Sequence, residues 1–275
     1  MLEATLLALG AAVLHAGWNL LLKQSDERVV TAWGFYLFGG VVLLPVLPFV
    51  DFPDGSALPY LAVSSFVHVA YILALSSAYH HGDFSLSYPL ARGGGALIAA
   101  LGGAAFLGDD LSALSWLSIA IVVGGLSSLV RPGAGRDALM FAGLTAVTIG
   151  VYTTLDAAGA RRSSGFGYAI VMGISAGLVI TVVGTLRGQR PAFVQAVRRD
   201  WRRMLVGGVA STLAYSMVLV AARRAPVGYV AAIRESSVVL GAAAGWLLLN
   251  EGFGRARLVS AMVVTLGLVA LVATR

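Results

Sequence analysis

The first apolar run of the chain reads LEATLLALGAAVLHAGWNLLL, from Leu2 to Leu22, and its only charged residue is Glu3 near the edge. About 20 apolar residues in an α-helix, rising about 1.5 Å each, cross the hydrocarbon core of a bilayer. The run has this length, and it lacks the basic segment that opens a secretory signal peptide. We therefore expect it to be the first transmembrane helix.

The composition of the whole chain agrees with a membrane protein. Hydrophobic residues make up 58% of the 275 residues and charged residues only 12%, whereas a soluble domain carries about 25% charged residues. A single soluble core of this size cannot hide so much apolar surface. The excess apolar side chains are therefore expected to face lipid.

The net charge of +6 does not indicate a nucleic-acid partner. Lys and Arg lie almost entirely between apolar runs, where they set membrane topology and meet anionic lipid headgroups. Cysteine is absent, which excludes disulfides, thiolate metal sites and a cysteine nucleophile. One lysine against eighteen arginines indicates a GC-rich bacterial genome, so we expect a multi-pass protein of the bacterial inner membrane.

Polar residues, prolines and glycines divide the chain into ten apolar runs, each of which is predicted to span the membrane. The longest connection, 187–202, carries Phe193, Val194 and Val197 among arginines, a pattern that favours a helix lying at the membrane interface. The predicted spans are 2–22, 29–50, 58–80, 83–107, 112–130, 137–158, 165–186, 203–223, 226–249 and 255–274.

The fourth and ninth runs resemble each other. Arg92 and Arg234 are each followed by small residues and, 17 positions later, by a carboxylate, Asp109 or Glu251. This similarity predicts a five-helix unit that occurs twice. Because five is odd, the second unit enters the membrane from the opposite side, and inverted repeats of this kind hold a substrate near the bilayer midplane.

The predicted fold is therefore an all-α membrane protein with ten transmembrane helices, arranged as two inverted five-helix repeats around a central cavity. The repeats are expected at 1–130 and 137–275.

Charged residues within the runs are the first candidates for a site, because a charge at the bilayer centre costs about 2.5–3.5 kcal/mol. Pro89 and the glycines 93–95 flank Arg92 and predict a broken helix beside a cavity. Arg92 either holds a substrate carboxylate or pairs with an acidic residue. Four charged residues within the runs qualify as candidates: Arg92, Asp156, Arg234 and Glu235.

The sequence leaves the roles of Arg234, Glu235 and Asp156 open. Arg234 and Glu235 are adjacent, so they point about 100° apart on a helix and only one is expected to face the cavity. The acidic partners considered for Arg92 are Asp156 and Glu235. Asp156 either carries a proton that drives transport or is a structural residue near the interface.

Polar and aromatic residues that share helix faces extend the candidate site. His15, Trp18 and Asn19 form one stripe, and Tyr71 shares a face with His68. Tyr88 and Tyr152 each precede a charged candidate by four residues. The predicted substrate-binding residues are His15, Trp18, Asn19, Tyr71, Tyr88, Arg92, Tyr152, Asp156, Tyr215, Arg234 and Glu235, with Ser216 and Tyr229 as weaker candidates.

No cofactor, metal site or catalytic residue is predicted. The chain lacks a phosphate-cradling Gly-Lys motif, an HExxH motif and a GxSxG motif. We therefore expect neither an ATPase nor another enzyme.

Four segments together resemble the EamA group of the drug/metabolite transporter superfamily: His15–Lys23, Tyr88–Gly93, Tyr152–Asp156 and Arg234–Ser237. The resemblance extends over nearly the whole chain. It implies ten helices in two inverted halves and a secondary transporter, usually an exporter of amino acids, related metabolites or drugs. It also implies alternating access around a cavity lined by helices 1, 3, 4, 6, 8 and 9.

The substrate class departs from that of the small four-helix relatives, which rely on a glutamate midway along helix 1. Here helix 1 has only Glu3, at its edge, so cation-for-proton antiport of their kind is not expected. The paired arginines indicate an anionic or zwitterionic solute, transported with or without protons. The expected partners are this solute and membrane lipid, with the chain as a monomer or homodimer.

Two other classes remain as alternatives: a flippase or intramembrane enzyme for lipid-linked substrates, and a non-transporting assembly subunit. A flippase should open laterally between helices, and a subunit should have no cavity.

The orientation in the membrane is left open by the sequence. Outside the fourth and ninth runs, twelve basic residues follow the odd-numbered runs and five lie on the other side. The positive-inside rule then places both ends of the chain outside, whereas the usual arrangement of the family places both inside. Six of the twelve lie in the connection between runs 7 and 8, and without them the difference nearly disappears.

Overall fold

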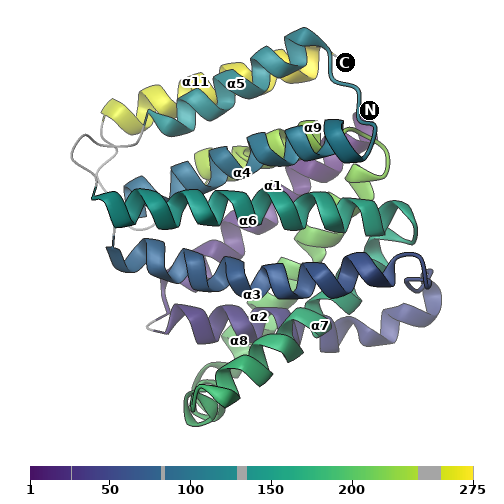
Figure 1. Ribbon diagram of the computed structural model, residues 1–275, viewed down its shortest axis with the longest axis vertical. Helices are drawn as coiled ribbons and strands as arrows, with labels where there is room; N and C mark the ends of the chain where they lie inside the picture. Colours follow the sequence, from purple (N-terminus) through teal and green to yellow (C-terminus); the bar gives the residue numbers. More distant parts are fainter. Residues whose placement is uncertain (26, 82–83, 129–134, 241–254, 275) are drawn as a thin grey trace.

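The computed structural model describes residues 1–25, 27–81, 84–128, 135–240 and 255–274, and these ranges form helices without any strand. The helices lie side by side, with the first and last residues at the same end of the bundle (Figure 1). Their bounds are α1 Leu2–Lys23, α2 Arg28–Leu43 with the 3₁₀-helix η1 Leu44–Phe49, α3 Leu58–His81, α4 Phe84–Phe106, α5 Ala113–Ser127, α6 Arg136–Arg161, α7 Gly165–Leu186, α8 Arg190–Ala222, α9 Val227–Arg234 and α11 Arg255–Ala273.

Length and composition make the chain a multi-pass membrane protein. In the described ranges, six helices are long and apolar enough to cross a bilayer, namely α1, α2 with η1, α3, α6, α7 and α8. Shorter apolar helices occur within α4, α5 and α11. Large apolar side chains such as Phe66, Phe106 and Leu266 are exposed on the outside of the bundle, where a soluble protein would carry charges.

The prediction of a broken fourth helix is wrong. The backbone of α4 is helical throughout, including Pro89 and the three glycines after Arg92. The glycines serve packing instead, because a Cβ on Gly94 would lie 2.8 Å from the Ala146 side chain and one on Gly95 would lie 2.8 Å from Ile149 Cβ. Their small size lets α4 approach α6 closely.

The interrupted helix is the predicted ninth span. α9 ends at Arg234, Glu235 forms a turn, and helix resumes at Ser236. At the interruption the Glu235 amide donates to Ala232 O at 3.0 Å and the Val238 amide donates to Glu235 O at 2.9 Å, which are i→i+3 bonds rather than α-helical ones. The rest of this span and Glu251 lie outside the described residues.

Two further boundaries differ from the predicted spans. The second span changes from α-helix to η1 after Leu43, where Pro45 and Pro48 cannot donate backbone hydrogen bonds. The segment predicted at the interface is the first part of α8, which begins at Arg190 and kinks at Asp200 (φ −122°, ψ 17°).

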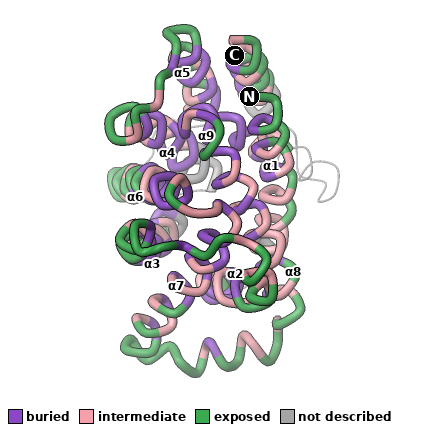
Figure 2. Tube along the Cα trace, turned by 90° about the vertical axis from the view of Figure 1, so that its right-hand side faces the viewer, coloured by how far each residue is buried: buried purple, intermediate pink, exposed green. Residues whose placement is uncertain are grey.

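Glycines also bring α2 and α8 into backbone contact. A Cβ on Gly208 would lie 2.7 Å from the backbone nitrogen of Gly39 and 2.9 Å from the carbonyl oxygen of Phe35. In lipid, where helices gain little from excluding water, such close packing supplies much of their association energy. α3 and α4 pack on α6 in a similar way, and α1 and α2 pack on α8. Buried residues gather between these two groups, while the outer faces are exposed (Figure 2).

Candidate functional site

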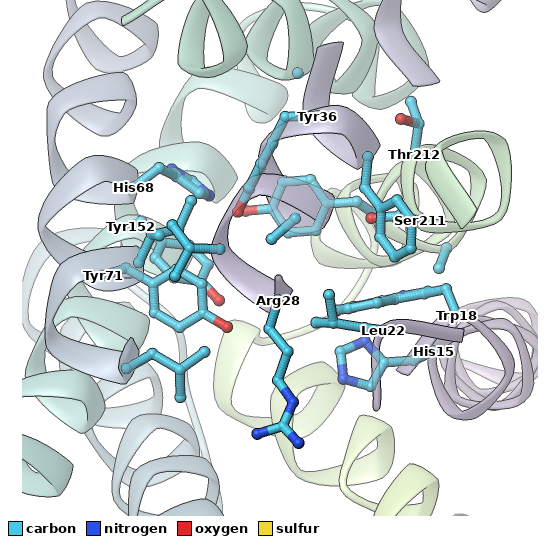
Figure 3. A pocket seen from close by; sticks show the side chains of 18 of the residues that line it. His15, Trp18, Leu22, Arg28, Tyr36, His68, Tyr71, Tyr152, Ser211 and Thr212 are labelled. Atoms are coloured by element: carbon cyan, nitrogen blue, oxygen red, sulfur yellow. The ribbon is translucent and has the colours of Figure 1, made fainter. Parts of the chain in front are cut away.

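A cavity of about 550 Å³ lies among the helices of the bundle. Exposed residues at one end of the bundle mark its mouth, including Glu27, Arg28, His80 and Gln189. Figure 3 shows two facing groups of side chains, with Tyr36 between them. The lining includes His15, Trp18, Phe35, Tyr36, His68, Tyr71, Arg92, Tyr152, Tyr215 and Arg234.

Arg92 lines the cavity and forms a buried ion pair with Glu235. Arg92 Nη2 lies 2.7 Å from Glu235 Oε1 and Arg92 Nε lies 3.1 Å from Oε2, a bidentate arrangement that matches the guanidinium fork to the carboxylate. The pair joins α4 to the turn after α9. The acidic partner considered for Arg92 in the sequence is therefore Glu235 rather than Asp156.

Arg234 also lines the cavity, and its side chain is only 5% exposed. Its Nε has no hydrogen-bond partner among the described residues, although the guanidinium interacts with the Tyr152 hydroxyl. Trp18 Nε1 is likewise buried without a partner. A buried donor left unsatisfied costs about 1–3 kcal/mol. Both atoms are enclosed and both residues line the cavity, so a small side-chain movement would let an acceptor group on a solute satisfy them.

One wall of the cavity is aromatic and is built by α2, α3 and α6. The His68 ring centroid lies 4.2 Å from that of Tyr152 and 5.6 Å from that of Tyr36. Tyr71 meets Tyr152 edge to face at 5.5 Å. Figure 3 shows His68, Tyr71 and Tyr152 grouped on this side.

The facing wall comes from α1 and α2. The His15 and Trp18 rings meet edge to face at 4.6 Å, and Trp18 meets Phe35 in the same way at 6.0 Å. Asn19 is not part of the cavity lining, since its Nδ2 donates to His15 O at 2.7 Å. The predicted stripe on the first helix therefore contributes two of its three residues to the lining.

Asp156 lies behind the cavity wall and is fully buried. It accepts hydrogen bonds from the Tyr168 hydroxyl at 3.0 Å and the Tyr215 hydroxyl at 2.5 Å. His68 Nε2 is 4.0 Å from Asp156 Oδ2. Since His68 and Tyr215 both line the cavity, they form the contacts between this carboxylate and the cavity.

The remaining predicted residues are Tyr88, Ser216 and Tyr229. The side chain of Tyr88 lies outside the described part of the chain, although its backbone belongs to α4. Ser216 donates to Thr212 O, and the hydroxyl of Tyr229 lies 2.6 Å from that of Thr5, so both are packing residues of the bundle.

Sequence reasoning did not select Tyr36, Phe35, Tyr168 or Arg28, and it noted His68 only for its shared face with Tyr71. Tyr36 could have been selected from the sequence, because it carries the only hydroxyl in the apolar run WGFYLFGG of α2. Tyr168 offers none, since its contact with Asp156 joins two different helices.

The end of the bundle opposite the mouth is held together by the cluster of Asp109, Arg161 and the first turn of α9, here called the Asp109 latch. Arg161 Nη2 lies 2.6 Å from Asp109 Oδ1, and Arg161 Nε donates to Ala222 O at 2.9 Å. Asp109 Oδ2 accepts the Val227 amide at 2.6 Å. The latch joins the ends of α4, α6, α8 and α9, and none of its residues lines the cavity.

Comparison with known proteins gives one fold and one family. A solved structure titled "Crystal structure of protein" superposes with a TM-score of 0.75 and 14% sequence identity, covering 99% of this chain and 99% of that one. No curated protein matches the sequence. The model of the EamA-like transporter family matches residues 137–273, the second half of the chain. The chain therefore belongs to the EamA-like transporter family of the drug/metabolite transporter superfamily.

Proposed function

We propose that this membrane transporter exports small amino-acid-like or organic-acid metabolites, or drugs that resemble them, by alternating access. The observation that carries the proposal is Arg234, a buried cation that lines a cavity with its mouth at one end of the bundle and whose Nε has no partner among the described residues. The Asp109 latch holds the opposite end together. A solute that binds at Arg234 would leave by the other end once the latch opens.

The proposed architecture is ten spans in two inverted repeats, 1–130 and 137–275. Helix packing supports it, because a contact between two helices has a counterpart in which each helix is replaced by the equivalent helix of the other half. α3 packs on α6 as α8 packs on α1, and α2 packs on α8 as α7 packs on α3. α2 with α7, α4 with α9 and α5 with α11 each join a helix to its counterpart. A two-fold relation between the halves accounts for all of these contacts.

The substrate class follows from the charges and the walls. Arg92 is neutralised by Glu235, and Arg28 is exposed at the mouth. Arg234 is therefore the buried cation of the lining that we propose to meet a carboxylate. The aromatic wall and the indole of Trp18 suit an apolar or aromatic side chain. A volume of about 550 Å³ falls within the range of about 300–1,000 Å³ usual for small-molecule sites. An organic carboxylate with an apolar body is therefore the favoured solute.

A proton is the proposed coupling ion, with Asp156 as its binding residue. The carboxylate is buried but reaches the cavity through His68 and Tyr215. Facilitated export without a proton is the alternative, and the Asp156 variant described in the Discussion distinguishes the two.

The test uses purified protein and matched solutes that differ by one group. Thermal unfolding is measured with aromatic and aliphatic amino acids, their N-acetyl derivatives and the corresponding amines without a carboxylate. We expect stabilisation by carboxylate-bearing solutes only, and its loss in Arg234→Ala. Arg223→Ala, which removes an exposed arginine, should behave like the wild type. Equal stabilisation by the amines, or no stabilisation by any solute, would contradict the proposal.

A transport assay separates export from the alternatives. Proteoliposomes loaded with the stabilising solute should release it chemically unchanged, which an intramembrane enzyme would not do. They should leave labelled phospholipids on their original leaflet, which a flippase would not do.

A further inference from the structure

The first part of α8 carries a row of exposed arginines. From Arg190 to Asp200 the helix precedes its kink, and it lies at the same end of the bundle as the cavity mouth. Its outer turns are exposed along the lower edge of Figure 2. The exposed arginines Arg190, Arg198 and Arg199, together with exposed Arg202 just after the kink, form what we call the α8 arginine face.

The opposite face of this segment is fixed to the protein. Phe193 is buried and its ring stacks on Trp33, with 4.4 Å between centroids and 23° between planes. Trp33 Nε1 in turn donates to Thr181 Oγ1 at 2.7 Å. Because the apolar side is covered by α2 and α7, the charged side is held outward and cannot turn away from whatever surrounds it.

The chemistry of the exposed side suits a phospholipid headgroup region. Arg190, Arg198 and Arg199 line one shallow groove together with Val194, which combines guanidinium groups with an apolar contact. The guanidinium of Arg202 lies 5.4 Å from the ring centroid of Trp201, which is 46% exposed. Tryptophan and arginine are the residues that gather at the boundary between lipid tails and headgroups.

Three arginines at the other end of the bundle are engaged within the protein, whereas Arg223 there is exposed. Arg161 is bound in the Asp109 latch, and Arg224 forms an ion pair with Glu3. The guanidinium of Arg162 lies 4.6 Å from the ring centroid of Tyr60 and donates to Ala158 O. These three cations are partly neutralised or covered. On the α8 side, Arg199 and Arg203 lie 4.0 and 3.8 Å from the partly exposed carboxylate of Asp200, while Arg190, Arg198 and Arg202 are exposed.

We propose that the α8 arginine face binds the phosphates of anionic phospholipids in the cytoplasmic leaflet and thereby orients the chain. Leu2 and Ala273 then lie toward the outer face of the membrane, and the cavity mouth opens to the cytoplasm. The inference rests on the proposed ten-span arrangement but not on any solute. In this orientation an exported solute enters the cavity directly from the cytoplasm.

The absence of cysteine makes the orientation directly measurable. Single cysteines are placed at Gly55, an exposed turn residue where a Cβ meets no atom within 4 Å, and at exposed Gln195 beside the arginine face. A membrane-impermeant maleimide is then applied to intact and to permeabilised cells. We expect Gly55→Cys to react in intact cells and Gln195→Cys only after permeabilisation. The reverse pattern, or reaction of both in intact cells, overturns the proposal.

Lipid binding is tested on the purified full chain. Unfolding temperatures are compared in phosphatidylglycerol and phosphatidylcholine nanodiscs, and with inorganic phosphate added to the latter. The wild type should be stabilised by phosphatidylglycerol but not by free phosphate. A variant with Arg190, Arg198, Arg199 and Arg202 all changed to Gln should lose the difference, and its Gly55→Cys form should label less completely in intact cells. An unchanged lipid difference in this variant contradicts the proposal, and so does equal stabilisation by free phosphate.

The labelling outcome is independent of transport. A failed solute assay with the expected labelling would remove the proposed function and leave the orientation standing. The reverse combination would leave a transporter whose mouth opens outward.

Discussion

At the residue scale, the neighbours Arg234 and Glu235 show how one break in a helix separates two charges. Glu235 turns to Arg92 and completes a bidentate pair, while Arg234 faces the cavity with its Nε unsatisfied. On a continuous helix two adjacent side chains already diverge by about 100°. Glu235 therefore serves packing, while Arg234 is left for the proposed solute.

Replacing Arg234 by Lys keeps the charge but removes the planar fork that matches a carboxylate. We expect the variant to bind a carboxylate-bearing solute about 10–100-fold more weakly than the wild type. Isothermal titration calorimetry measures the affinity directly. Arg223→Lys is the matched control, and equal losses in both variants would exclude a specific role for Arg234.

The Arg92–Glu235 pair predicts strong coupling in stability. Arg92→Met or Glu235→Leu alone leaves a buried charge without its partner and is expected to cost about 3–5 kcal/mol. The double variant Arg92→Met with Glu235→Leu should lie close to the wild type, because both charges are removed together. Unfolding free energies in mixed micelles complete the cycle. Additive losses would show that the two side chains act independently.

Asp156→Asn should separate binding from proton coupling. The amide oxygen can still accept from one of the two tyrosine hydroxyls, Tyr168 or Tyr215, and the amide NH2 can donate to the other. The side chain no longer takes up a proton. In proteoliposomes we expect solute exchange to persist while the response to an imposed pH gradient disappears.

Asp54→Asn is the control for this experiment. The Ser56 hydroxyl donates to the Asp54 carboxylate and holds the pKa of this exposed group below its usual range. Asp54 therefore stays ionised near neutral pH, and its loss should leave the gradient response intact. If the Asp54 variant alone lost the response, Asp156 would not be the coupling residue.

At the element scale, the sequence predicts what depends on local pattern and misses what depends on contacts between helices. Long apolar runs located most helices, and two of the four charged candidates, Arg92 and Arg234, line the cavity. The glycines after Arg92 suggested a hinge, but they pack against Ala146 and Ile149 of another helix. Tyr168 could not be selected because only the tertiary structure places its hydroxyl against Asp156. The family resemblance, carried by short motifs, was confirmed by the match over 137–273.

The crossing of α2 and α8 gives a matched pair of glycine variants. Gly208→Ala places a methyl group against the Gly39 backbone and is expected to destabilise the protein by about 1–3 kcal/mol. Gly124→Ala meets no atom within 4 Å and should be neutral or slightly stabilising. Unfolding measured side by side tests the pair. Equal stability of the two variants would mean that the helices separate easily at this crossing.

At the scale of the whole molecule, the two ends of the bundle are unlike. One end holds the cavity mouth, and the other holds the Asp109 latch with the Glu3–Arg224 ion pair. Alternating access requires the latched end to separate while the mouth closes. The latch is therefore the contact whose removal should shift the balance between the two states.

Asp109→Asn removes the charge that Arg161 binds and weakens the hold on the first turn of α9. With a single cysteine at Ala225, which is 6% exposed beside the latch, maleimide labelling should be several-fold faster in the Asp109→Asn background than without it. Asp137→Asn, a change in the first turn of α6 at the other end of the bundle, is the control. Unchanged labelling in the Asp109 variant would show that this end stays closed without the latch.

The interruption after α9 has a mechanical consequence. The eight residues of α9 form a rod of about 12 Å, anchored at its start by the Asp109 carboxylate and ending at Arg234 without α-helical continuity. A tilt of about 20° about the anchor carries the far end through about 4 Å, given this length. That displacement exceeds the length of a hydrogen bond, so a small rotation suffices to bring the Arg234 guanidinium to a solute or withdraw it. α9 can therefore pivot about its start at the Asp109 latch, and this rotation would move the proposed binding residue, Arg234, at its other end.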